Sequence, residues 1–116
     1  MKRIILLAFL CTTTLVMAQR INHVQEAIAN YDYEAALTLI AKEKPTIPLL
    51  LQKGKAQRGL GMNTEALSTY QEIIANDTAN TRAYIEAAEC CRSLAKYQQA
   101  LKYYEQALDL NPENKY

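Results

Sequence analysis

Residues 81–114 read TRAYIEAAECCRSLAKYQQALKYYEQALDLNPEN, and much of this stretch repeats what lies 34 residues before it. The residues that recur at this spacing are Arg58, Leu60, Ala66, Leu67, Tyr70 and Asn80, which align with Arg92, Leu94, Ala100, Leu101, Tyr104 and Asn114. A fixed period of roughly 20 to 50 residues is typical of proteins that stack copies of one structural unit. The sequence therefore predicts a repeat architecture.

The chain beyond residue 20 has the composition of helices. Ala, Leu, Glu, Gln, Lys and Tyr dominate it, and no β-branched run alternates strictly with polar residues. Turn-forming residues divide it at intervals, in the stretches 30–32, 45–48, 59–63, 76–81 and 111–112. We expect an all-α fold with helices over about 20–30, 33–43, 48–60, 64–76, 81–94 and 97–110. Asp32, Asn63 and Asn80 stand where helix-capping side chains belong.

Three units of similar pattern follow one another along the chain, at about 20–46, 47–80 and 81–114. The last unit carries the pattern at Tyr84, Ala87, Ala88, Cys91, Ala100, Tyr104 and Pro112. The middle unit carries it at Leu50, Lys53, Gly54, Gln57, Ala66 and Tyr70, with Thr78 in the place of the proline. The first unit is more divergent, and its counterparts are Tyr33, Ala36 and Ile40. These residue types at this period resemble the tetratricopeptide repeat. Three places depart from that repeat, because Lys53 stands where it has a buried leucine, and Gln57 and Cys91 stand where it has an aromatic residue. Because Ala36 and Ala66 are 30 residues apart, we expect a shortened turn around 44–48.

The resemblance implies an α-α superhelix of about three helix-turn-helix repeats that acts as a non-catalytic protein interaction module. Small and aromatic residues pack the repeats, at the matching places Gly54, Ala66, Tyr70, Tyr84, Ala88, Ala100, Tyr104 and Pro112. The first helix of each pair lines a concave groove that binds a peptide or a partner protein. The matching groove residues are Gln25, Leu51, Lys55, Arg58, Ile85, Glu89 and Arg92.

Arg58 and Arg92 recur at one period, which places two guanidinium groups on one wall of the predicted groove. Their planar forks match the geometry of a carboxylate, so they could hold an acidic peptide. The alternative is local pairing, since Glu89 and Arg92 stand three residues apart on one predicted helix. The sequence leaves both interpretations open.

The first 18 residues are typical of a secretory signal peptide. Lys2 and Arg3 precede an apolar block, and the segment ends in Val16-Met17-Ala18. We therefore expect cleavage after Ala18 and export to the periplasm or beyond, in the secreted or outer-membrane-associated fraction of a Gram-negative bacterium. An uncleaved anchor is less favoured because Ile4 to Ala18 is shorter than the roughly 20 residues that span a bilayer. In a lipoprotein Cys11 would carry the lipid, but Leu10 stands where a small residue normally precedes such a cysteine.

The charge and residue content of the processed chain exclude several classes of function. Of the 13 basic residues Lys2 and Arg3 lie in the signal segment, so 11 remain against 12 acidic residues, a net charge of −1. This balance argues against nucleic-acid binding. No nucleophile motif, phosphate-binding glycine loop or metal-ligand spacing is present, and His23 is the single histidine. We expect no enzyme activity, no cofactor, no metal and no membrane span after cleavage.

The sequence also gives predictions for two cysteines, which could be buried or form a bridge, and for one threonine, which could be glycosylated. Neighbouring Cys90 and Cys91 are too close along a helix to bridge each other. We expect Cys91 to be a small core residue, with an intermolecular bridge through Cys90 as the alternative. Asp77-Thr78-Ala79 resembles the sites that some Gram-negative bacteria O-glycosylate, so Thr78 is a candidate modification site, although the motif also fits an ordinary helix cap.

The predicted last helix, 97–110, carries Leu101, Tyr104 and Leu108 without a polar capping helix after it. Exposed apolar surface of this kind marks an interface. We expect either a longer repeat protein of which this is the N-terminal part, or an open end that is covered by a partner or, through self-association by this helix, by another copy. Two alternatives to the interaction module remain. The chain could be the N-terminal part of a larger envelope enzyme or signalling receptor, or a purely structural oligomerisation unit.

Overall fold

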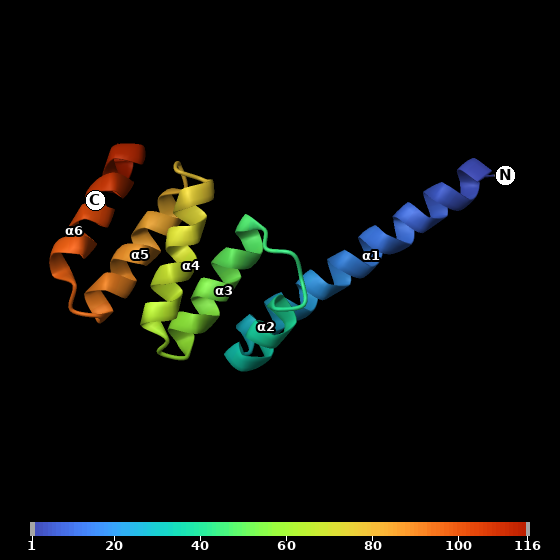
Figure 1. Cartoon of the computed structure of the whole chain (residues 1–116), viewed down its shortest axis with the longest axis horizontal. Helices are drawn as coiled ribbons and strands as arrows, with labels where there is room; N and C mark the ends of the chain where they lie inside the picture. The colour runs from blue at the N-terminus through green and yellow to red at the C-terminus, as the bar shows by residue number, and fades with distance from the viewer. Residues whose placement is uncertain (1, 116) are drawn as a thin grey trace.

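The computed structural model describes the backbone of residues 2–115 and the side chains of residues 12–113. The described chain consists of helices joined by short turns (Figure 1): α1 (Lys2–Ala29), α2 (Tyr33–Ile40), α3 (Ile47–Gly59), α4 (Asn63–Asn76), α5 (Thr81–Ser93), α6 (Tyr97–Leu110) and the short 3-10 helix η1 (Pro112–Lys115). The predicted all-α fold is confirmed.

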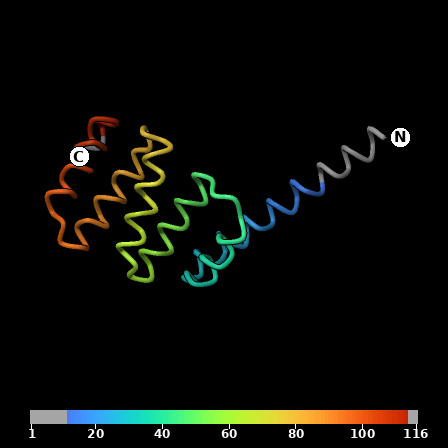
Figure 2. Tube along the Cα trace, viewed as in Figure 1, coloured from blue at the N-terminus to red at the C-terminus, as the bar shows by residue number. Residues whose placement is uncertain are grey.

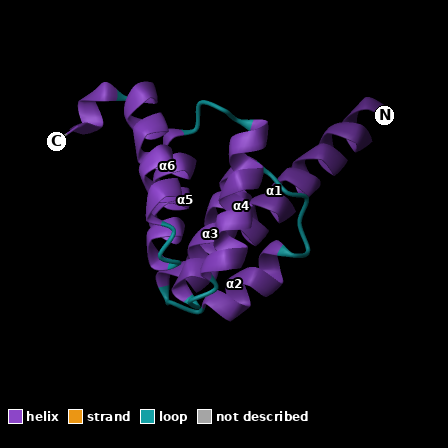
Figure 3. Ribbon diagram, turned by 60° about the vertical axis from the view of Figure 1, so that its left-hand side comes forward, coloured by secondary structure: helices purple, strands orange, loops and turns teal. Residues whose placement is uncertain are grey.

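The helices form an elongated stack in which each helix packs on its neighbours in the chain. The principal extents are 62 × 29 × 23 Å, and the stack runs from α2 at one side to α6 at the other (Figure 2). A view turned by 60° shows the same succession of helices joined by short loops (Figure 3). Residues 12–20 of α1 are exposed and extend away from the other helices. The predicted cleavage point after Ala18 falls within α1, so the processed chain would keep the part of this helix that contacts α2.

The turns inside the three helix pairs share one geometry. Each has a single residue in the left-handed region: Tyr31 with φ 59°, Gly61 with φ 75° and Ala95 with φ 59°. In each turn the next N–H donates to the carbonyl five residues earlier, in the pairs Asp32 to Ala27, Met62 to Gln57 and Lys96 to Cys91. This bond satisfies a carbonyl that the end of the helix leaves free. The repeat is therefore structural as well as compositional.

The first pair departs from the others in its second helix. The expected shortening of the turn around 44–48 is wrong, because the linker spans 41–46 whereas 77–80 suffice between α4 and α5. The missing residues come from α2, which has 8 residues where α4 and α6 have 14. Pro45 prevents this helix from reaching the length of α4, since proline disfavours helical geometry in the residue before it and lacks the N–H that a helix needs.

Side-chain caps begin three of the helices. Asp32 accepts from the N–H of Ala35, Asn80 accepts from the N–H of Ala83, and Thr46 accepts from the N–H of Leu49. Asn63 was expected to cap α4 and does not, because it is the first residue inside the helix and Met62 holds the capping position without a side-chain bond. Caps of this kind stabilise a helix by about 1 kcal/mol each.

Two clusters of buried side chains form the core. The larger joins α3 to α6 and contains Leu50, Leu67, Tyr70, Ile73 and Cys91 among others. The smaller joins α1, α2 and α3 through Val24, Ile28, Ala36, Ile40 and Leu49. Complete burial of a side chain such as Ile73 contributes about 1.5 to 3 kcal/mol. These clusters fix the order of the helices, with α1 in contact with α3 and an ion pair joining α3 to α5.

Candidate binding surface

The residues predicted to line a groove lie on α1, α3 and α5, and we call their surface the first-helix face. Gln25, Lys55 and Arg92 are exposed on it, while Leu51, Arg58, Ile85 and Glu89 are half-buried. Leu51 also packs against the larger core cluster. The face thus has an apolar base with polar side chains around it.

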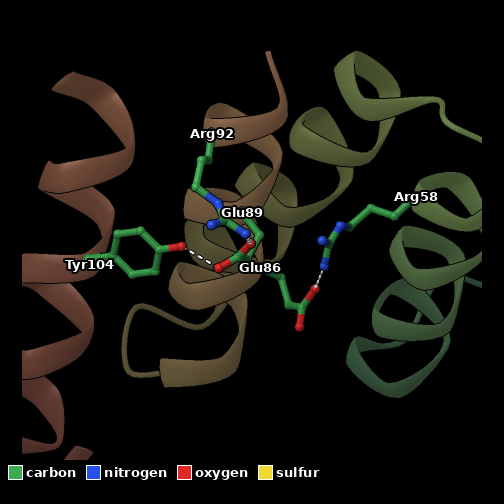
Figure 4. A network of polar contacts seen from close by, with 5 residues as sticks. All are labelled: Arg58, Glu86, Glu89, Arg92 and Tyr104. Atoms are coloured by element: carbon green, nitrogen blue, oxygen red, sulfur yellow. Dashed lines mark hydrogen bonds and ion pairs between the residues drawn. The ribbon is translucent and has the colours of Figure 1, made fainter. Parts of the chain in front are cut away.

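The first contact that spans this face is an ion pair between α3 and α5. The Arg58 guanidinium donates to a carboxylate oxygen of Glu86, and both side chains are about one quarter to one third exposed (Figure 4). Burial lowers the pKa of Arg58, but the charge of Glu86 and the hydrogen bond to it raise this pKa to a net value above the usual one. Arg58 is therefore a permanently charged group that ties the second repeat to the third.

Glu89 is the centre of a second polar cluster on α5 and α6. Arg92 donates to Glu89 Oε2 at 2.6 Å, and the Tyr104 hydroxyl donates to Glu89 Oε1 (Figure 4). The hydrogen bond from Tyr104 lowers the pKa of Glu89, burial opposes it, and Arg92 lowers the pKa further. Burial and the bond to Glu89 raise the pKa of Tyr104. The local pairing of Glu89 with Arg92 is thus present, and each of the two guanidinium groups already faces a carboxylate.

A pocket of about 370 Å³ lies between α1 and α3 on the first-helix face. It brings together the predicted residues Gln25 and Lys55, and its other lining residues are Ile28, Ala29, Tyr31, Tyr33 and Gln52. Lys55 takes part in none of the ion pairs found among the described side chains. The pocket therefore combines an available ammonium group with aromatic and apolar walls.

The sequence did not predict Glu86, Gln52 or Tyr31 for this surface, and it assigned Tyr33 to the pattern of the first unit. A signal for two of them exists, because Gln52 and Glu86 are one 34-residue period apart and so occupy the same place in successive repeats. Tyr31 and Tyr33 lie in the turn and second helix of the first unit, where the pattern is weakest. Their position at the pocket follows from the turn geometry at Tyr31.

A second pocket, of about 400 Å³, lies among α2, α3, α4 and the linker at 41–46. Its walls include Ile40, Leu49, Leu50, Lys53 and Glu72. The shortened α2 accounts for this pocket: the places held by Ile73 and Ile74 in the second unit fall on Glu43 and Lys44 of the linker. Polar residues in an irregular segment do not fill the space that two isoleucines fill in α4.

Most of the predicted packing residues lie in the core. Gly54, Ala66, Tyr70, Tyr84, Ala88 and Ala100 are buried. Tyr104 is half-buried because its hydroxyl reaches Glu89, and Pro112 is exposed at the end of α6, where it begins η1. The Tyr84 hydroxyl donates to the carbonyl of Thr78 at 2.9 Å and holds the loop between the second and third pairs.

Position 57, where the resemblance implies an aromatic residue, carries a glutamine with a buried partner. The Thr69 hydroxyl donates to Gln57 Oε1 at 2.7 Å between α3 and α4, and both residues are buried. A buried amide costs stability unless it is paired. This bond explains how the core accepts a glutamine at this position.

Both described cysteines are buried, as expected for Cys91. The alternative of an intermolecular bridge through Cys90 is contradicted, because a thiol with no exposed surface cannot meet a thiol of another molecule. The side chain of Cys11, the alternative lipidation site, lies outside the described side chains. Thr78 is exposed in its turn, and its glycosylation stays a prediction.

The described part of the chain contains neither a cluster of metal ligands nor a helix that could span a membrane. No group of three or more potential metal ligands comes together there. None of the described helices combines the length and apolar character that crossing a bilayer requires. His23 lies on the exposed side of α1, where its Nδ1 is 3.8 Å from Oε2 of Glu26.

Comparison with known proteins connects this geometry to a family. Residues 81–114 match the family model described as tetratricopeptide repeat. The fold resembles PcrH in complex with the chaperone binding region of PopB, with a TM-score of 0.77 and 19% identity over 82% of this chain and 80% of that one. It also resembles a structure described as MamA MSR-1 C2, with a TM-score of 0.71 and 17% identity over 87% of this chain and 58% of that one. No curated protein matches the sequence.

These comparisons confirm the repeat that the sequence indicated in residues 81–114. At identities below one fifth the two structural likenesses show a shared fold. This shared fold extends over 82% of the chain in one case and 87% in the other.

Proposed function

We propose that this chain, which carries a tetratricopeptide repeat, is a non-catalytic interaction module that binds a peptide or partner helix on the first-helix face. Stacked helix pairs bind partners on the surface that their first helices line. The observation that carries the proposal is the pocket between α1 and α3, where Gln25 and Lys55 meet. The solved complex of PcrH with a region of PopB supports a peptide as the class of partner.

The chemistry of the pocket defines the peptide that would fit. Lys55 offers an ammonium group outside the ion pairs of this face, whereas Arg58 and Arg92 already have Glu86 and Glu89. A ligand carboxylate therefore gains the most binding free energy at Lys55, because there it breaks no existing ion pair. Tyr31, Tyr33 and Ile28 form walls for an apolar side chain. We propose a peptide with one acidic residue close to a bulky apolar one.

Selection of peptides on the full chain tests this proposal. A displayed library of random 12-residue peptides is selected against the protein, and the affinities of the enriched peptides are measured by fluorescence anisotropy. Lys55→Glu should weaken binding about tenfold or more, which corresponds to about 1.4 kcal/mol. The matched control is Lys102→Glu, which makes the same charge change at an exposed site on α6. Equal affinities for the two variants would overturn the proposal.

The proposed place of action is the cell envelope of a Gram-negative bacterium, in the periplasm or outside it. Support comes from the basic start, apolar block and small residue at position 18. Expression of the full chain with a C-terminal tag in such a host, followed by fractionation and mass spectrometry, should yield a protein that begins at Gln19. An unprocessed chain in the cytoplasm would contradict export. Ala18→Leu should leave the precursor uncut, because the peptidase needs a small residue there.

A further inference from the structure

The outer face of α6 carries a stripe of apolar side chains that are exposed or half-buried. Tyr97 is 66% exposed and Leu101 is 58% exposed, and Tyr104 and Leu108 lie half-buried beside them. The four residues recur at spacings of four, three and four, so they lie on one face of the helix. Isolated exposed leucines are ordinary in proteins, but a continuous stripe of this kind needs an explanation.

The equivalent residues on α4 show what kind of surface covers such a stripe. One period earlier, the places of Leu101, Tyr104 and Leu108 are held by Leu67, Tyr70 and Ile74. Leu67 is 5% exposed and Tyr70 is 1% exposed, because α5 packs over them. The stripe on α6 is therefore the continuation of an interface that exists inside the molecule between α4 and α5.

The helix that covers α4 presents small residues to it. Ala83, Ala87 and Cys90 of α5 are all fully buried in one cluster with Leu67 and Tyr70. They stand at positions i, i+4 and i+7 and share one side of α5. Tyr84 lies on another side of α5, toward α6, where its ring meets that of Tyr103 with centroids 6.4 Å apart. Small residues on one helix against large residues on the next define this interface.

An acidic residue, Glu86, lies beside the three small residues of α5. Glu86 stands three residues after Ala83 on α5 and pairs with Arg58 of the preceding repeat. Arg92 holds the place of Arg58 one period later, and its side chain is 65% exposed. Its present partner is Glu89 on the same helix, and because a guanidinium has five N–H donors, Arg92 can take a second carboxylate while it keeps this pair. An acidic residue on a helix laid over α6 would meet Arg92 as Glu86 meets Arg58.

We infer that the outer face of α6, together with Arg92, is a second docking surface, and that it receives a helix of a partner protein with the pattern of α5. That pattern is small residues at i, i+4 and i+7 and a carboxylate at i+3. The inference rests on continuity with the α4–α5 interface and on charge complementarity at Arg92. It does not depend on the peptide site at Lys55.

A second copy of this chain does not offer this pattern at its free end. In α1 the places of Ala83, Ala87 and Cys90 fall on Gln19, His23 and Glu26, all of them exposed and polar. Laying α1 of another copy over α6 would set these polar groups against Leu101 and Tyr104 without partners. Desolvation of unpaired polar groups opposes such a contact. Of these two separate molecules, a partner protein is therefore favoured over α1 of a second copy.

The test uses the full chain and a labelled peptide with the sequence of residues 79–94. Cys90→Ala and Cys91→Ala in the peptide prevent oxidation, and a staple between positions 85 and 89, opposite the three small residues, holds the helix that a short peptide would not keep alone. Fluorescence anisotropy should show saturable binding. Leu101→Asp in the protein should weaken it about tenfold or more, whereas Gln106→Asp, which places the same charge at another exposed site on α6, should not.

A charge exchange tests the acidic position. Arg92→Glu should weaken binding of the peptide, and a peptide with Glu86→Arg should recover affinity for the Arg92→Glu protein. Lys55→Glu should leave binding unchanged, which separates this surface from the peptide site. Absence of saturable binding would overturn the inference. It would also be overturned if light scattering showed a dimer of the chain that Leu101→Asp dissolves, because a second copy would then cover the face.

Discussion

Tyr70 of α4 lies directly over the backbone of Gly54 in α3. A β-carbon built on Gly54 would stand 2.4 Å from Cζ of Tyr70 and 2.7 Å from its hydroxyl oxygen. Tyr70 is buried in the larger core cluster, so its ring cannot move aside into solvent. The glycine is therefore required by the ring that crosses it. One period later Ala88 and Tyr104 hold the same places, and there Tyr104 is half-buried and bonded to Glu89.

Gly54→Ala should destabilise the protein. Overpacking costs about 1 to 3 kcal/mol, and the better helix propensity of alanine returns about 1 kcal/mol. Because the contact is this close, we take the upper end of the overpacking cost and expect a net loss of about 2 kcal/mol. Urea unfolding followed by circular dichroism measures it. Ala88→Gly is the reciprocal control and should lose about 1 kcal/mol through propensity alone. A Gly54→Ala protein as stable as the original would show that the ring does not constrain this site.

Ala95→Gly should stabilise the protein, because Ala95 holds a φ of 59° in the turn between α5 and α6. A residue with a β-carbon pays about 1 to 2 kcal/mol in this conformation, and the extra freedom of glycine in the unfolded chain offsets part of the gain. We expect a gain of about 0.5 to 1 kcal/mol in the free energy of unfolding. Gly61→Ala, at the same place one period earlier, should lose a similar amount. A loss on Ala95→Gly would contradict the shared turn geometry.

The Glu89 cluster should make stability depend on pH in the acid range. The pKa of Glu89 is lowered in the folded state, so its contribution is complete above the ordinary glutamate pKa and is lost as the pH falls through the lowered pKa. Glu89→Gln should therefore cost about 0.5 to 1.5 kcal/mol at neutral pH and progressively less in acid. Urea midpoints across this range measure the difference. A cost that stays constant with pH would rule out this role of the carboxylate.

The buried cysteines should be chemically silent in the folded protein. Burial raises the pKa of Cys90 to about 11, Arg58 opposes this and Glu86 adds to it. Burial also raises the pKa of Cys91. Because the thiolate is the reactive form, neither thiol should react with a disulfide reagent at mildly alkaline pH until urea unfolds the chain. The measurement is made on a Cys11→Ser variant. Rapid reaction of one thiol in the folded protein would show that this part of α5 opens.

The helix pattern of this chain could be predicted from its sequence because the signals are local. Four of the helices, α3 to α6, begin and end within one residue of the predicted bounds, since Pro, Gly, Asn and Asp mark the turns beside them, whereas α1 begins at Lys2 and not near residue 20. The left-handed residues Tyr31 and Ala95 carry no such mark, as neither is a glycine. The shortened α2 was also missed. A 30-residue spacing shows that four residues are absent without showing from which element they are taken.

The candidate site could be predicted in part. The period placed Lys55, Arg58, Glu89 and Arg92 on the first helices, because equivalent positions of a repeat fall on equivalent faces. Pairing across the face depends on which residues meet in space. Arg58 and Glu86 are 28 residues apart on different repeats, and the sequence does not show that they meet. The pocket at Lys55 depends likewise on the turn at Tyr31.

The central claim, that the first-helix face is the peptide-binding surface, is tested most directly by nuclear magnetic resonance. Amide spectra of the ¹⁵N-labelled full chain are recorded during titration with a peptide selected on the protein. We expect the changes in chemical shift to concentrate on α1, α3 and α5, around Gln25, Gln52 and Lys55, and to saturate with the affinity measured by anisotropy. Changes confined to α6, or to the pocket among α2, α3 and α4, would contradict the claim.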